Sequence, residues 1–167
     1  MTIPQVSGNE GLLPLGRHQA TLDEIEALFV TAAPFSEQRA LIFSALTTWV
    51  TLVEQILPVS RYWIDRGFVT HKTWAPPSDV DVTILCQEKD LDALGPAEQD
   101  RLGLLLTIPA DGQRPRIQPM GGLVDSFVTK RGPSGNTPYW NQQWSRVRGA
   151  DGKELLNLSK GFLEVIA

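Results

Sequence analysis

The stretch "WIDRGFVTHKTWAPPSDVDVTIL", residues 63–85, brings together a change in secondary structure and an unusual pair of acids. Residues 79–86 alternate aliphatic side chains with other residues, which is the period-2 pattern of a β-strand. The glycine and two prolines of residues 66–78 predict a turn-rich connection before that strand. Asp79 and Asp81 therefore stand at the mouth of a strand that we expect to be buried.

On either side of this stretch, helical and strand patterns mix without regular alternation. Thr21 and Glu24 form a capping box that predicts a helix start. An apolar stripe with steps of three and four predicts a long helix that Pro58 ends. We expect helices over residues 21–29, 37–57, 96–106 and 139–148. We expect strands over residues 60–65, 79–86 and 123–128, and either a helix or a strand over residues 161–167.

These elements predict an α+β fold, in which a small β-sheet has helices packed on one side. Residues 1–20 contain three glycines and two prolines, and we expect them to form an extended lead-in. Residues 21–167 contain no internal repeat and no stretch typical of a linker. We therefore expect them to form a single domain.

The composition is that of an ordinary globular chain of 167 residues, with 42% hydrophobic and 20% charged residues. A net charge of -4 and a pI near 5.1 argue against a generally basic surface that coats nucleic acid. Cys86 is the single cysteine, so an internal disulfide is excluded and its apolar neighbours predict a buried thiol. With no signal-peptide pattern and no membrane-length apolar run, we expect a cytoplasmic protein without a membrane partner.

Asp79 and Asp81 are expected to point to the same face of a strand, because residues i and i+2 do so. Two carboxylates this close repel each other unless a cation lies between them. Oxygen-only ligands suit Mg²⁺ or Mn²⁺, and Mg²⁺ commonly binds through one or two carboxylates together with substrate phosphates. The pair therefore predicts a site for a metal-bound nucleotide. The alternative is a solvated turn in which Asp79 caps the loop.

A third acid, Asp125, lies in the apolar run "LVDSFV", residues 123–128. A lone acid among apolar residues needs a partner when it is buried. If this strand lies beside the strand of residues 79–86, the three acids converge and could hold two ions for phosphoryl or nucleotidyl transfer. The alternative is that Asp125 points to solvent from an edge strand.

The set formed by Arg66–Gly67, Asp79–Asp81 and Asp125 resembles the motif of the nucleotidyltransferase superfamily related to DNA polymerase beta. That motif places a Gly-Ser turn before Asp-hydrophobic-Asp, with a third acid on a later strand. A closer resemblance is to a family of small bacterial and phage nucleotidyltransferase-like proteins. It is carried by "GLLPLGRHQATLDEIEALF" (residues 11–29), by "WIDRGFVTHK" with "PSDVDV", and by Lys160–Gly161.

The resemblance implies a nucleotidyltransferase-like fold, a nucleoside triphosphate substrate, and Mg²⁺ or Mn²⁺ as cofactor. The residues that it implies as catalytic and metal-binding are Asp79, Asp81 and Asp125. The residues that it implies as nucleotide-binding are Arg66, Gly67, Thr70 and Lys72. A lysine in such a loop can equally be solvated, so the role of Lys72 has two interpretations.

This chain departs from the family pattern at Arg66–Gly67, where the family has Gly-Ser. Gly67 keeps the turn permissive, but the serine hydroxyl is missing. Arg66 could supply a charge-assisted phosphate contact instead. It could equally fill the phosphate site, or pair with Asp79 or Asp81 in place of the metal.

Three functions follow as hypotheses. The first is an enzyme that transfers a nucleotidyl group to a hydroxyl on a protein, an RNA or a small molecule. The second is a binding or regulatory module that has lost turnover, with a cognate partner in a toxin–antitoxin or phage-defence setting. The third is a protein-interaction domain with a structural metal or a solvated loop.

Three basic residues near the end of the chain have two interpretations. They could line an acceptor site or form a solvated surface, and they are Arg146, Arg148 and Lys160. Trp140 and Trp144 are expected in the core.

Overall fold

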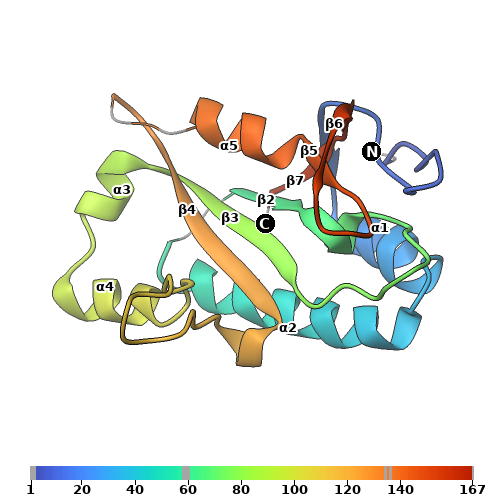
Figure 1. Ribbon diagram of the computed structural model, residues 1–167. Coiled ribbons are helices and arrows are strands. Elements are labelled where there is room, and N and C mark those ends of the chain that lie inside the picture. Colours follow the sequence, from blue (N-terminus) through green and yellow to red (C-terminus); the bar gives the residue numbers. More distant parts are fainter. Residues whose placement is uncertain (1–2, 58–60, 134, 136, 167) are drawn as a thin grey trace.

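The computed structural model describes residues 3–57, 61–133, 135 and 137–166. In this part of the chain, five strands form one mixed sheet in the order β1-β7-β2-β3-β4 (Figure 1). The pairs β1–β7 and β3–β4 are parallel, and the pairs β7–β2 and β2–β3 are antiparallel. The bounds are β1 Arg17–Ala20, β2 Arg61–Asp65, β3 Val80–Gln87, β4 Val124–Arg131 and β7 Phe162–Ile166.

Helices and a separate hairpin surround this sheet. The helices are α1 Leu22–Glu26, α2 Ser36–Glu54, α3 Glu88–Asp92, α4 Pro96–Gly103 and α5 Thr137–Trp144. The other helical segments are the π-helix η1 Ala27–Thr31 and the 3-10 turns η2 Arg66–Val69 and η3 Met120–Gly122. The hairpin pairs β5 Arg146–Arg148 with β6 Glu154–Ser159. None of the helices in the described part of the chain is both long and apolar enough to span a bilayer.

The pleat of the strands gives the sheet two differently packed faces. The main core includes Trp49 of α2 together with Val80, Val82 and Ile84 of β3. A second cluster on the opposite face joins Trp63, Leu85, Trp144 and Phe162. The expectation of helices on one side is therefore wrong, because α2 covers one face and α5 packs on the other (Figure 1).

The α+β class is confirmed, and the predicted strands over residues 60–65, 79–86 and 123–128 correspond to β2, β3 and β4. The capping box of Thr21 and Glu24 is also present, with both of its hydrogen bonds formed. The long helix α2 ends at Glu54 rather than at residue 57. Pro58, which we expected to end it, and Ser60 lie outside the described residues.

Two further expectations need correction. Residues 1–20 are not only a lead-in, because β1 joins the sheet and Leu13 is buried in the main core. The helix expected over residues 139–148 ends at Trp144, and Arg146–Arg148 forms the strand β5 instead. Of the two alternatives for residues 161–167, the strand is found as β7, which lies between β1 and β2.

Candidate functional site

Three aspartates form one row across neighbouring strands. Asp65 of β2 is the register partner of Asp81 of β3, and Asp81 is the register partner of Asp125 of β4. Strand alternation places the row on the face opposite α2. Asp79 directly precedes β3. Asp65 was missed by the sequence analysis, although its place at the end of a strand before the glycine turn was a usable signal.

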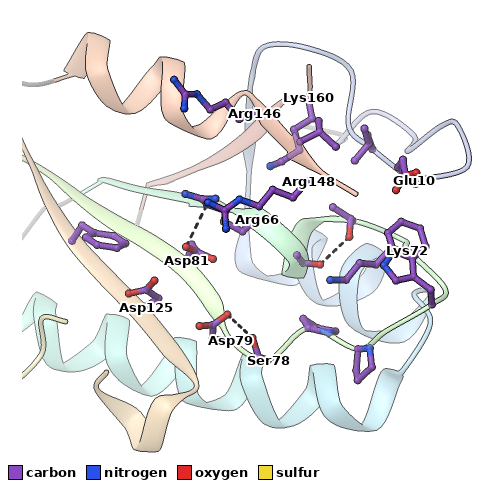
Figure 2. Close-up of a pocket in the computed structure, with 18 of the residues that line it drawn as sticks. Glu10, Arg66, Lys72, Ser78, Asp79, Asp81, Asp125, Arg146, Arg148 and Lys160 are labelled. Atoms are coloured by element: carbon purple, nitrogen blue, oxygen red, sulfur yellow. Dashed lines mark hydrogen bonds and ion pairs between the residues drawn. The ribbon is translucent and has the colours of Figure 1, made fainter. Parts of the chain in front are cut away.

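Asp81 and Asp125 line a cavity of about 400 Å³ (Figure 2). The cavity also contains the other residues that the resemblance implied as site residues, which are Arg66, Gly67, Thr70, Lys72 and Asp79. Three basic residues with a suggested acceptor role line it as well: Arg146, Arg148 and Lys160. Arg116, from the segment between α4 and β4, also lines the cavity and was not predicted to take part. Residues far apart in the sequence therefore line one cavity with many charged side chains.

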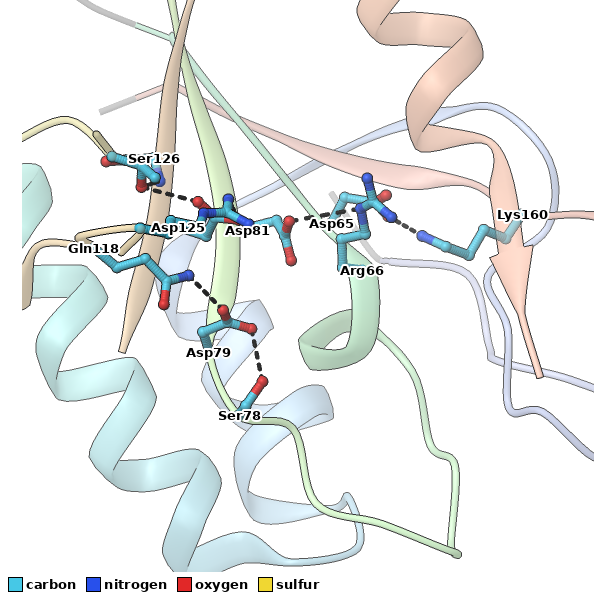
Figure 3. A network of polar contacts seen from close by, with 11 residues as sticks. Asp65, Arg66, Ser78, Asp79, Asp81, Gln118, Asp125, Ser126 and Lys160 are labelled. Atoms are coloured by element: carbon cyan, nitrogen blue, oxygen red, sulfur yellow. Dashed lines mark hydrogen bonds and ion pairs between the residues drawn. The ribbon is translucent and has the colours of Figure 1, made fainter. Parts of the chain in front are cut away.

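Arg66 forms an ion pair with Asp81, with Nε 3.5 Å from Oδ1 (Figure 3). The Arg66 backbone has φ of 67°, in the left-handed region that favours glycine. Its Nε is buried and has no hydrogen-bond partner among the described residues. The pairing of Arg66 with Asp81 is found, and its two alternative roles at a phosphate stay predictions.

Asp125 is 5% exposed, so it does not point to solvent although β4 is an edge strand. Its carboxylate forms an ion pair with Arg116 and accepts a hydrogen bond from Thr107 Oγ1 at 2.8 Å. Thr107 Oγ1 in turn accepts from the backbone N–H of Ser126 at 2.9 Å. The acid is therefore held in a fixed orientation by groups from two segments.

Asp79 is oriented by two neutral donors. Ser78 Oγ donates to its Oδ1 at 3.0 Å, and Gln118 Nε2 donates to its Oδ2 at 2.7 Å (Figure 3). Asp79 therefore does more than cap a solvated turn, because an amide from the loop before β4 reaches it. Neither donor carries a charge that would neutralise the carboxylate.

Asp65 is fully buried and forms an ion pair with Lys160, which is 4% exposed (Figure 3). Lys160 lies between β6 and β7, and its amide also donates to the carbonyl of Ser145. The solvated-surface alternative for Lys160 is therefore wrong. The buried Oδ2 of Asp65 has no hydrogen-bond partner in the described chain, which leaves part of its charge uncompensated.

Burial raises the pKa of two acids in this row, Asp65 and Asp81. Burial raises the pKa of the Asp81 carboxyl well above its ordinary value; Arg66 opposes this, whereas Asp79, Asp125 and Asp65 add to it. Burial also raises the pKa of Asp65, against the lowering effect of Lys160. Each acid of the row has one cationic partner, so burial is the main cause of these two shifts.

The turn η2 that carries Arg66 and Gly67 is anchored from beneath by Arg39 of α2. The Arg39 side chain is fully buried and donates to the carbonyls of Phe68 at 2.6 Å and Thr70 at 2.7 Å. It also donates to the carbonyls of Pro34 and Phe29. Burial lowers the pKa of its guanidinium to about 10. No local sequence pattern indicates this role, because Arg39 lies inside an otherwise regular helix.

Lys72 reaches back over the turn rather than into open solvent. A Cβ atom built on Gly67 would lie 3.2 Å from Lys72 Nζ, so the ammonium sits against the glycine backbone. Burial lowers the pKa of Lys72, the charge of Arg39 lowers it further, and Asp79 opposes the shift. Thr70 Oγ1 donates to the Gly67 carbonyl at 2.9 Å, which closes the turn.

A family model described as "Family of unknown function (DUF6932)" matches residues 4–166. The chain belongs to this family. No curated protein and no solved structure matches the chain. The match to the DUF6932 family covers the whole sheet and every residue of the cavity. It does not test the nucleotidyltransferase resemblance, which stays a prediction.

The donor chemistry of Asp79, Asp81 and Asp125 fits a hard divalent cation, because all three offer only oxygen ligands. A cation bound here would offset the like charges of Asp79, Asp125 and Asp65, which add to the raised pKa of Asp81. In the described chain, Arg66 offsets the charge of Asp81 and Arg116 offsets the charge of Asp125. As these residues stand, no three acidic, histidine or cysteine side chains in that part of the chain are spaced to hold a metal ion.

Proposed function

We propose that the chain is a cytoplasmic nucleotidyltransferase, which transfers a nucleotidyl group from a nucleoside triphosphate to a hydroxyl on a protein, an RNA or a small molecule. The observation that supports this most is the register of Asp81 and Asp125 on parallel strands, with Asp79 beside them in the same cavity. Basic groups suited to phosphates line the same cavity, namely Arg66, Lys72 and Arg116.

In this proposal Asp79 and Asp81 would hold Mg²⁺ or Mn²⁺, which would supply charge stabilisation for the phosphoryl oxygens. Gly67 lets the triphosphate approach the backbone of η2, and Lys72 contacts its oxygens. The acceptor oxygen attacks the α-phosphorus, the bond to the bridging oxygen breaks, and pyrophosphate leaves. The carboxylate of Asp125 takes the proton from the acceptor hydroxyl.

Incubation with labelled nucleoside triphosphates, Mg²⁺ or Mn²⁺ and a cell extract tests this activity. The wild-type chain is expected to transfer label, and Asp81→Asn is expected to abolish transfer. Asp92→Asn, on the exposed side of α3, is the matched control and should keep it. Label transfer that survives Asp81→Asn would refute the assigned site.

A second candidate, a binding or regulatory module without turnover, is favoured by the ion pairs of Arg66 with Asp81 and of Arg116 with Asp125. Its partner would be a cognate protein of a toxin–antitoxin or phage-defence pair. Calorimetry with ATP and Mg²⁺ separates the candidates, because no binding at millimolar nucleotide counts against the enzyme.

The double variant Arg66→Gly/Gly67→Ser restores the family pattern and extends this test. The added Cβ at position 67 would meet the flexible end of Lys72, which can shift, so the variant should fold. A gain of nucleotide binding in this variant would identify a degenerate site in the natural chain. Equal binding in both forms would show that Arg66 does not obstruct the nucleotide.

A further inference from the structure

Trp74 differs from the other tryptophans of the chain in its exposure. Trp74 is 41% exposed and lines the cavity. Trp49, Trp63 and Trp144 are at most 1% exposed. Trp140, the fifth, is partly buried against the second cluster. An indole offers a large apolar surface that is normally buried, so an exposed one inside a polar cavity is available to a ligand.

The segment that carries Trp74 is held firmly at its base. The amide of His71 donates to the Gly11 carbonyl at 2.9 Å, and His71 Nε2 lies 2.8 Å from the Leu28 carbonyl oxygen. Pro76 and Pro77 follow Trp74, and their fixed φ angles reduce the freedom of the loop. Both prolines line the cavity as well. The indole is thus presented on a preorganised wall rather than on a loose loop.

Lys72 and Trp74 line the same cavity and are two residues apart in the sequence. The Lys72 ammonium sits against Gly67, where the proposed function puts the triphosphate. Two residues of extended chain span at most about 7 Å, so the indole lies within reach of a base attached to those phosphates. The cavity is therefore charged at Lys72 and apolar at Trp74, Pro76 and Pro77.

We propose that Trp74 is the stacking platform for the nucleobase, and that it makes the site favour purine over pyrimidine nucleotides. This inference rests on the proposed function, since it takes the bound ligand to be a nucleotide. Stacking on an aromatic face accepts every base because every base has a π-face, and it is stronger for larger ring systems. Trp74 is a specificity-determining residue here, with no part in the reacting atoms.

The test measures binding of ATP, CTP and inorganic tripolyphosphate by calorimetry, and tryptophan fluorescence in parallel. ATP should quench the fluorescence and should bind more tightly than CTP, whereas tripolyphosphate should bind without quenching. Trp74→Ala should weaken ATP binding by about 5- to 150-fold, with tripolyphosphate binding unchanged. Trp74→Phe should recover most of the ATP affinity. Tyr139→Ala, which removes an aromatic ring that is 56% exposed outside the cavity, is the matched control and should bind as wild type.

Four results would overturn the inference. Equal affinities of the wild-type chain for ATP and CTP would refute the purine preference. Unchanged ATP binding in Trp74→Ala would refute the stacking role of Trp74, and the proposed function would still stand. An equal loss of ATP and tripolyphosphate would show that Trp74 only supports the loop. Failure of the wild-type chain to bind either ligand would overturn the proposed function together with this inference.

Discussion

Asp81 and Asp125 are register partners on the parallel strands β3 and β4, and each forms an ion pair with a different arginine. Arg66 reaches Asp81 from the turn after β2, and Arg116 reaches Asp125 from the loop before β4. Two like charges at adjacent positions, one buried and one partly buried, are tolerated because guanidinium groups from both sides offset them. The same arrangement makes any incoming cation a competitor of these arginines.

Replacing Arg66 tests that competition. Arg66→Gly removes the partner of Asp81 and also relieves a left-handed backbone conformation that costs a non-glycine residue about 1 kcal/mol. We expect Mn²⁺ affinity, measured by electron paramagnetic resonance, to rise about tenfold. Arg114→Gly, in an exposed loop, should leave it unchanged. Equal Mn²⁺ affinity in wild type and Arg66→Gly would show that no cation competes for this carboxylate.

Removing one partner of the Asp65–Lys160 pair should lower the free energy of unfolding more than removing both partners. Lys160→Met leaves a buried carboxylate without its cation, and we expect the free energy of unfolding to fall by about 3–5 kcal/mol. The double variant Asp65→Asn/Lys160→Met should recover most of that loss. Urea denaturation of the four forms completes the cycle, and additive losses would contradict the coupling.

Arg39 should matter for stability although it lies beneath the cavity and does not line it. Arg39→Met leaves four backbone carbonyls without their charged donor, and we expect a loss of at least about 3 kcal/mol in thermal or urea unfolding. Arg39→Lys should recover little, because an ammonium cannot reproduce the guanidinium fork. Arg101→Ala, exposed on α4, should cost almost nothing.

Cys86 should be unreactive in the folded chain. Burial raises the pKa of its thiol to about 11, Asp90 adds to the shift, and Lys130 opposes it. A raised thiol pKa keeps the neutral form, so the reactive thiolate appears only as pH rises toward 11. At pH 8 we expect labelling by a disulfide reagent to be very slow, and to become fast once urea unfolds the chain. Rapid labelling under native conditions would contradict the buried position.

The strands next to the acids could be predicted because their signals are local. The alternation in β3 and the capping box of Thr21 depend on residues close in sequence, and both are found. β5 was missed because three residues, Arg146–Arg148, are too few to show a period. The partners Arg116 and Lys160 were beyond sequence reasoning, because only the pairing of distant segments brings them to Asp125 and Asp65.

The position of β7 in the sheet determines the order in which the strands can pair during synthesis. This strand follows all the other described strands in sequence, yet it lies between β1 and β2. A chain emerging from the ribosome can pair β2, β3 and β4 as each is made, but β1 stays unattached until Phe162–Ile166 has been synthesised. The lysine that neutralises Asp65 arrives at the same late moment, so a nascent chain would lack a finished cavity.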